Sequence, residues 1–120
     1  MTSLEKMKLA VRFLDSKKAK DISILKVTGV TLLADYFILC SGTSSTQVRA
    51  LADGVEEALE KAGEKPFVKE GRQGQNWILM DYSDVIIHVF NQETREFYDL
   101  EKLWSDAEEI PVEDILEEDK

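Results

Sequence analysis

Apolar positions recur along this chain with two different periods, and the change of period predicts its helices and strands. Over residues 3–18 they return every three or four positions, so we expect an amphipathic helix with Ser3 as its N-cap. A second helical stripe follows Ser44, which forms a capping-box pattern with Gln47. Gly63 is a natural end for this second helix.

Five short segments have the pattern of strands. Residues 36–42 ("YFILCSG") are nearly all apolar, which is typical of a central strand buried on both faces. Residues 76–82 and 84–90 are separated by one residue, Ser83, and predict a hairpin. The expected strands cover 21–27, 36–42, 65–71, 76–82 and 84–90, with a turn at 72–75.

A final helical segment is expected over 91–104. The order of elements is then helix, two strands, helix, three strands and helix, which predicts an α/β domain with a mixed five-stranded sheet flanked by helices. We expect this domain to span residues 1–106. Residues 107–120 hold many acids and few aliphatic side chains, so we expect a separate acidic tail, mobile or helical only when docked.

Charge is placed unevenly along the 120 residues, whose net charge is -9. The segment 105–120 contributes most of it, and the rest of the chain is nearly balanced. Binding driven by the phosphate backbone of nucleic acids needs a surplus of Lys and Arg, which this chain lacks. An acidic chain suits a basic protein partner, although the acid excess could also serve solubility alone.

The sequence contains few features that bear on membrane insertion, secretion or disulfide formation. No apolar run approaches the ~20 residues of a membrane helix. The first residues lack the pattern of a secretion signal. Cys40 is the single cysteine, which rules out an intrachain disulfide. We therefore expect a cytoplasmic protein that does not contact a membrane.

The turn in "CSGTSS" has the form of an anion-binding loop, with Gly42 after a strand and Ser44 before a helix. It matches neither of the glycine-rich nucleotide-binding motifs, GxxxxGK(S/T) and GxGxxG. A magnesium-dependent nucleotidyltransferase would also need paired carboxylates, and Asp81 and Asp84 are three residues apart, a spacing that does not share a strand face. A hairpin turn could still bring them together. A structural role is favoured, in which Gly42 permits the turn and Ser44 caps the helix.

Cys40 and His88 are the next candidate pair for catalytic chemistry. Both lie in apolar strands, which favours an inert thiol and a sheet histidine over a nucleophilic dyad. One Cys and one His cannot build a usual His/Cys metal site. We therefore expect no cofactor and no metal.

The late aromatic residues are more informative. If Trp77 faces solvent on its strand, Leu79 and Asp81 share its face. With Tyr98 and Trp104 nearby, such a face would suit protein binding, because Trp and Tyr bury a large area at low entropic cost. The alternative is that the tryptophans only pack the last helix onto the sheet. The spacing leaves both interpretations open.

Four stretches of this chain together resemble the ribosomal silencing factor family, also called RsfS or Iojap. They are "ADYFILCSGTSSTQV" (34–48), "EG" (70–71), "WILMDYSDVIIHVF" (77–90) and "REFYDLEKLW" (95–104). The resemblance covers roughly residues 3–106.

This resemblance implies a non-enzymatic translation factor with a nucleotidyltransferase-like fold that lacks the catalytic carboxylate pair. Members bind the large ribosomal subunit through ribosomal protein uL14, block association with the small subunit and repress translation in nutrient limitation. They also tend to form homodimers when free. The residues that would contact uL14 here are Trp77, Leu79, Asp81, Tyr82, Asp84, Tyr98, Leu100, Glu101 and Trp104, with Asp99 as a further acid. The alternatives are a magnesium-dependent nucleotidyltransferase-like enzyme and an interaction module with another partner.

Overall fold

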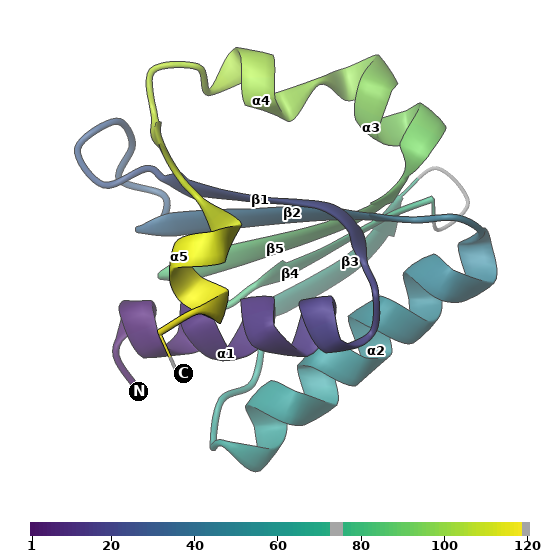
Figure 1. Cartoon of the computed structure of the whole chain (residues 1–120), viewed down its shortest axis with the longest axis horizontal. Coiled ribbons are helices and arrows are strands. Elements are labelled where there is room, and N and C mark those ends of the chain that lie inside the picture. The colour runs from purple at the N-terminus through teal and green to yellow at the C-terminus, as the bar shows by residue number, and fades with distance from the viewer. Residues whose placement is uncertain (73–75, 119–120) are drawn as a thin grey trace.

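The structure is a computed structural model that describes residues 1–72 and 76–118. Its elements in chain order are α1 (Ser3–Ser16), β1 (Lys20–Lys26), β2 (Tyr36–Gly42), α2 (Ser45–Lys61), β3 (Val68–Arg72), β4 (Trp77–Asp81), β5 (Val85–Asn91), α3 (Gln92–Tyr98), α4 (Leu100–Leu103), β6 (Glu108–Ile110) and α5 (Val112–Leu116). The strands form one mixed sheet in the order β3-β4-β5-β2-β1-β6. Helices α1, α2 and α5 cover one face, and α3 and α4 cover the other (Figure 1).

The predicted α/β class and the order of elements up to β5 are confirmed, and three details differ. The sheet has six strands rather than five, because 108–110 pair with β1 at its edge. The expected last helix is two helices, divided at Asp99, whose φ of 45° is left-handed. The N-cap of α1 is Thr2 rather than Ser3, and it forms a capping box with Glu5. The predicted turn at 72–75 lies mostly outside the described residues, and the likeness to nucleotidyltransferases stays a prediction.

β2 and β5 form the centre of the sheet and are the one parallel pair among the described strands. Every residue of β2 is buried, as its apolar run predicts, and β5 is buried from Val85 to Phe90. A parallel pair needs a crossover connection, and α2 lies within it. The carboxyl ends of β2 and β5 therefore lie side by side, and from there α2 leaves toward one face of the sheet and α3 toward the other (Figure 1).

The larger core lies between the sheet and α1, α2 and α5. It is almost entirely aliphatic, and its helix residues include Met7, Val11 and Leu14 from α1 and Leu51, Val55 and Leu59 from α2. A Cβ at Gly54 would lie 2.5 Å from the Phe13 ring, so glycine allows α1 and α2 to approach closely here.

A smaller core lies between the sheet and the segment 92–107. Its buried members are Leu25, Val27, Ala34, Phe37, Leu39, Ile86 and Phe90. Partly buried Trp77, Leu79, Leu100, Trp104 and Ala107 pack against it, so this core is open at its margin.

The acidic C-terminal segment is docked on the domain as far as it is described. β6 pairs with β1, and Ile115 of α5 is 4% exposed in the larger core. The Glu118 carboxylate lies 2.8 Å from Lys8 Nζ and 3.5 Å from Arg12. The few aliphatic side chains of this segment are thus enough to cover α1 and β1, and two cations offset part of its charge.

Candidate protein-binding surface

The aromatic residues gather on the α3–α4 face of the sheet around Trp77. The Trp77 ring stacks on Phe90 and contacts Tyr98, with ring centroids 4.9 Å apart in each pair. Its indole Nε1 donates a hydrogen bond to His88 Nδ1 at 3.1 Å. These contacts fix the tryptophan ring, yet Trp77 stays half-buried at the margin of the smaller core.

Trp104 anchors the other end of the segment 92–107. Its ring meets Phe37 edge to face, with centroids 5.1 Å apart and an interplanar angle of 89°. Trp104 and Trp77 therefore both pack the α3–α4 segment onto the sheet, which is the structural interpretation given above. Each also keeps part of its surface in solvent, which the protein-binding interpretation requires. Leu79 and Asp81 share the Trp77 face of β4, because burial alternates along that strand.

Three exposed apolar side chains belong to this neighbourhood, and sequence reasoning passed over two of them. Phe97 is 81% exposed and lies edge to face with Tyr98, which is itself 38% exposed. Leu103 on α4 is 71% exposed. In such short helices the apolar period is too brief to separate a buried from an exposed face, so only the structure identifies them. We call Trp77, Leu79, Tyr98, Leu100 and Trp104, with Phe97 and Leu103, the aromatic surface.

Arg95 holds this surface in place, and sequence reasoning gave it no role. Its side chain is buried, and its Nη1 donates to the Asp21 carbonyl oxygen at 2.5 Å and to Ser41 Oγ at 3.0 Å. Its Nη2 donates to Ser23 Oγ at 3.2 Å and to the Glu101 carboxylate at 2.8 Å. One guanidinium thus joins α3 and α4 to β1 and β2. The available signal was that Arg95 is the lone cation between residues 91 and 101.

Glu101, a predicted contact residue, is paired with Arg95 within the protein. Its carboxylate accepts two hydrogen bonds from Arg95, at 2.8 and 3.2 Å, and its side chain is 34% exposed. Its charge is therefore largely neutralised within the protein. Asp99 is exposed between α3 and α4, so its carboxylate is more open to solvent than that of Glu101.

Tyr82 and Asp84 lie apart from the other predicted contact residues. The Asp84 carboxylate accepts a hydrogen bond from the buried Lys6 ammonium of α1 at 2.8 Å. Tyr82 is 2% exposed in the larger core, with its ring 6.0 Å from Lys6 Nζ, and burial raises the pKa of its phenol. Both residues therefore contact α1, on the far face of the sheet, and their positions favour a structural role.

The turn and the carboxylates of the enzyme hypothesis are engaged in structural contacts. Asp81 Oδ1 accepts from the Ser83 N–H at 2.7 Å, and Ser83 has a left-handed φ of 76°. Ser44 Oγ accepts from the Gln47 N–H at 3.1 Å, as its capping pattern predicts. Within residues 1–72 and 76–118, no three His, Cys, Asp or Glu side chains gather as a metal site would need. This arrangement favours the structural interpretation of "CSGTSS".

Cys40 and His88 do not form a dyad. Residue 39 pairs with His88 in the parallel register, so His88 lies on the aromatic face while Cys40 lies in the larger core. Cys40 is 0% exposed, and burial raises its pKa to about 12. Its thiol therefore stays protonated near neutral pH and is chemically inert, as predicted.

None of the helices in the described part of the chain has the length and apolar character to cross a membrane.

A family model described as "Ribosomal silencing factor during starvation" matches residues 1–120. A protein named "Ribosomal silencing factor RsfS" from Halalkalibacterium halodurans is 37% identical over 116 residues, which cover 97% of this chain and 99% of that protein. The mouse protein "Mitochondrial assembly of ribosomal large subunit protein 1" is 34% identical, with 81% of this chain and 44% of that protein covered. The crystal structure of a Chromobacterium violaceum protein aligns with a TM-score of 0.83 at 38% identity, covering 88% of each chain.

Proposed function

The chain belongs to the ribosomal silencing factor family, and from that premise we propose that it binds the large ribosomal subunit through ribosomal protein uL14. Bound at the face where the small subunit docks, it prevents the subunits from joining and so represses translation when nutrients are short. The mechanism is steric and transforms no molecule. The protein acts in the cytoplasm, and it forms a homodimer when free of the ribosome.

The aromatic surface is the observation that carries this proposal. Trp77, Tyr98 and Trp104 are large side chains held in fixed positions by ring contacts. Such pre-ordered aromatic groups lose little entropy on binding and are the usual centres of protein interfaces. A surface of about 800 Å² on each partner is enough for a stable complex.

The charges around the cluster suit a basic partner. Asp81 borders it on β4, and Asp99 lies between α3 and α4. Acidic groups at the rim of an apolar centre guide the approach of a basic protein and set its orientation more than they add affinity. Glu101 contributes mainly by holding Arg95, and Tyr82 and Asp84 support the β4–β5 turn from the α1 side.

Residues 1–106 carry the proposed contact surface, and the acidic segment 107–120 lies outside it. Within this segment, β6 forms the sheet edge opposite β3, and α5 docks on α1 (Figure 1).

A sucrose gradient of purified ribosomal subunits with added protein tests the proposal. The wild-type protein should migrate with large subunits and lower the fraction of joined ribosomes. The double variant Trp77→Ala/Tyr98→Ala should bind at least about thirtyfold more weakly, since a single tryptophan or tyrosine at a binding centre contributes about 2 kcal/mol and two such contributions do not simply add.

The matched control is Phe67→Ala, which removes an aromatic ring that is 79% exposed but lies just before β3, outside the aromatic surface. It should bind as the wild type does. Urea unfolding of each variant shows whether the protein is folded. A folded Trp77→Ala/Tyr98→Ala protein that still migrates with large subunits at wild-type affinity contradicts the proposal.

A further inference from the structure

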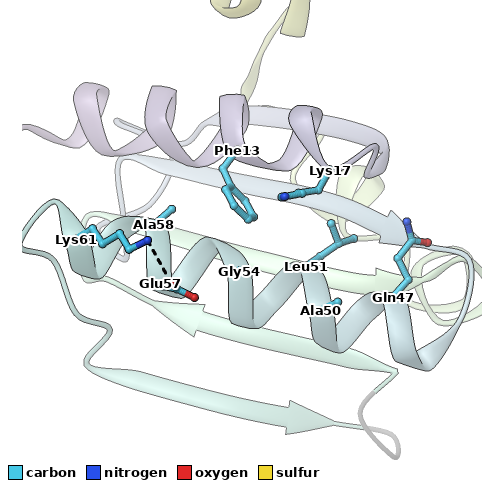
Figure 2. Close-up of a pocket in the computed structure, with 9 residues that line it drawn as sticks. All are labelled: Phe13, Lys17, Gln47, Ala50, Leu51, Gly54, Glu57, Ala58 and Lys61. Atoms are coloured by element: carbon cyan, nitrogen blue, oxygen red, sulfur yellow. Dashed lines mark ion pairs between the residues drawn. The ribbon is translucent and has the colours of Figure 1, made fainter.

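An open groove runs between α1 and α2 on the face opposite the aromatic surface (Figure 2). Its volume is about 680 Å³. Phe13 of α1 and Lys17 at the C-cap of that helix form one wall. The floor and the other wall come from α2 and consist of Gln47, Ala50, Leu51, Gly54, Glu57, Ala58 and Lys61.

Small side chains at a spacing of four create this groove. Ala50, Gly54 and Ala58 follow one another along the same side of α2, and the Phe13 ring points toward Gly54 (Figure 2). The lining of α2 from Gln47 to Lys61 extends over about four helical turns, or about 21 Å. The groove is therefore long and shallow, which fits a helix better than a compact small molecule.

Cations lie at both ends of the apolar floor. The Lys17 ammonium is 5.8 Å from the centre of the Phe13 ring, and no ion pair of Lys17 is found among the described residues. At the far end Lys61 lies 3.2 Å from Glu57, and the Lys61 side chain is 77% exposed (Figure 2). The lining thus carries a small positive excess on a chain whose net charge is -9.

The other flank of α1 already holds an occupant with the complementary chemistry. The short acidic helix α5 places Ile115 in the larger core, and Glu118 beyond it pairs with Lys8 and Arg12 of α1. Apolar contact flanked by carboxylate–cation pairs is therefore how α1 binds an acidic helix within this protein. Phe13 and Lys17 offer the same combination on the α2 side.

We propose that the α1–α2 groove binds an acidic amphipathic helix of a partner protein. The apolar stripe of that helix lies over Phe13, whose ring covers Gly54, with close approach at Ala50 and Ala58 on either side of the ring. Its carboxylates meet Lys17 at one end and Lys61 at the other. Since the groove and the aromatic surface lie on opposite faces of the sheet, both can be occupied together (Figure 1). The site goes beyond the proposed ribosomal function and does not depend on it.

Fluorescence anisotropy with a labelled synthetic helix tests the site on the isolated full-length protein. The probe is a peptide of about 18 residues with Leu at helical i, i+3, i+4 and i+7 positions and Glu on the flanks. The comparison peptide carries Lys in place of every Glu. The acidic probe should bind at least about tenfold more tightly than the basic one.

Two pairs of substitutions locate the binding. Ala50→Gln/Ala58→Gln fills the groove with longer side chains while keeping good helix formers on α2, and it should weaken binding about tenfold. The matched control Arg49→Gln/Glu60→Gln adds two glutamines at exposed positions of α2 outside the groove, with no change in net charge, and should bind as the wild type does. Lys17→Glu/Lys61→Glu should weaken binding of the acidic probe about fivefold or more.

Three results overturn the proposal. They are no binding of the acidic probe at millimolar concentration, equal binding of both peptides, and an affinity that Ala50→Gln/Ala58→Gln leaves unchanged. Sedimentation equilibrium could give a fourth such result. If the wild-type protein is a dimer and Ala50→Gln/Ala58→Gln makes it a monomer, the groove is an interface between two copies of this chain. The Trp77→Ala/Tyr98→Ala protein should bind the probe normally, which separates this site from the ribosomal surface.

Discussion

The two faces of the sheet differ in what covers them and in how completely they are covered. On one face, α1 and α2 bury aliphatic side chains to between 0 and 2% exposure. On the other face, Phe37 and Phe90 are buried, but Trp77, Tyr98 and Trp104 beside the short helices α3 and α4 remain partly exposed. One face of this fold therefore supplies stability, while the other presents a shaped surface.

Helix length explains much of this contrast. α1 and α2 have 14 and 17 residues with long apolar stripes, whereas α3 and α4 have only 7 and 4. Helices that short are not stable by themselves and need tertiary contacts. Arg95 and the two tryptophans provide those contacts, so the aromatic surface depends on a few side chains.

Thiol labelling should show the largest difference between the faces. Cys40 is fully buried and burial raises its pKa to about 12, so at pH 8 the native thiol is protonated and shielded. We expect its labelling by iodoacetamide to be more than about a thousandfold slower than in the unfolded protein, because it requires extensive opening.

Leu39 offers the matched position, since it is equally buried on β2 but faces the aromatic side. Leu39→Cys in a Cys40→Ala background should be labelled at least about tenfold faster than Cys40, through local opening of the segment 92–107. Mass spectrometry measures both rates, and urea titrations correct for global stability. Equal corrected rates would show that the two faces open together.

A second test compares adjacent residues of β5 that face opposite cores. Ile87 is 0% exposed in the larger core, and Ile87→Ala should lower the free energy of unfolding by about 3 kcal/mol. Ile86 is 9% exposed in the smaller core, and Ile86→Ala should cost less, about 1–2 kcal/mol, because its surroundings can collapse or admit water. Urea denaturation gives both values. A larger cost at Ile86 would reverse the assignment of stability to the α1–α2 face.

A third test removes the guanidinium that holds the aromatic surface. Arg95→Met should lower the free energy of unfolding by about 2 kcal/mol, since it leaves Ser41 and the Asp21 carbonyl without their donor. Hydrogen exchange should accelerate in residues 92–107 and not in α1 or α2. Binding to the large ribosomal subunit should also weaken, although Arg95 is buried and would not itself contact the ribosome.

Glu101→Gln is the control for Arg95, because an amide oxygen can still accept from the guanidinium. Because the Arg95 charge is buried and Glu101 is partly exposed, the loss of the carboxylate should cost about 1 kcal/mol, less than Arg95→Met. Uniform acceleration of exchange in Arg95→Met, over both faces alike, would mean that Arg95 stabilises the whole domain rather than one surface.

Much of the fold followed from local patterns. The apolar stripe and the capping pair Ser44–Gln47 predicted α2, and the Ser44 hydroxyl caps the Gln47 N–H as expected. The continuous apolar run of 36–42 predicted the central strand. These features depend on residues a few positions apart, which is why the sequence determined them.

The tertiary structure decided what depends on distant residues. Arg95 reaches Ser41 and Asp21 across 54 and 74 positions of the chain, and no local pattern indicates such partners. The side of the sheet that Trp77 faces, the burial of Tyr82 against α1 and the docking of β6 on β1 were likewise set by packing. A local pattern tells which side chains share a face, but only the assembled layers determine what covers that face.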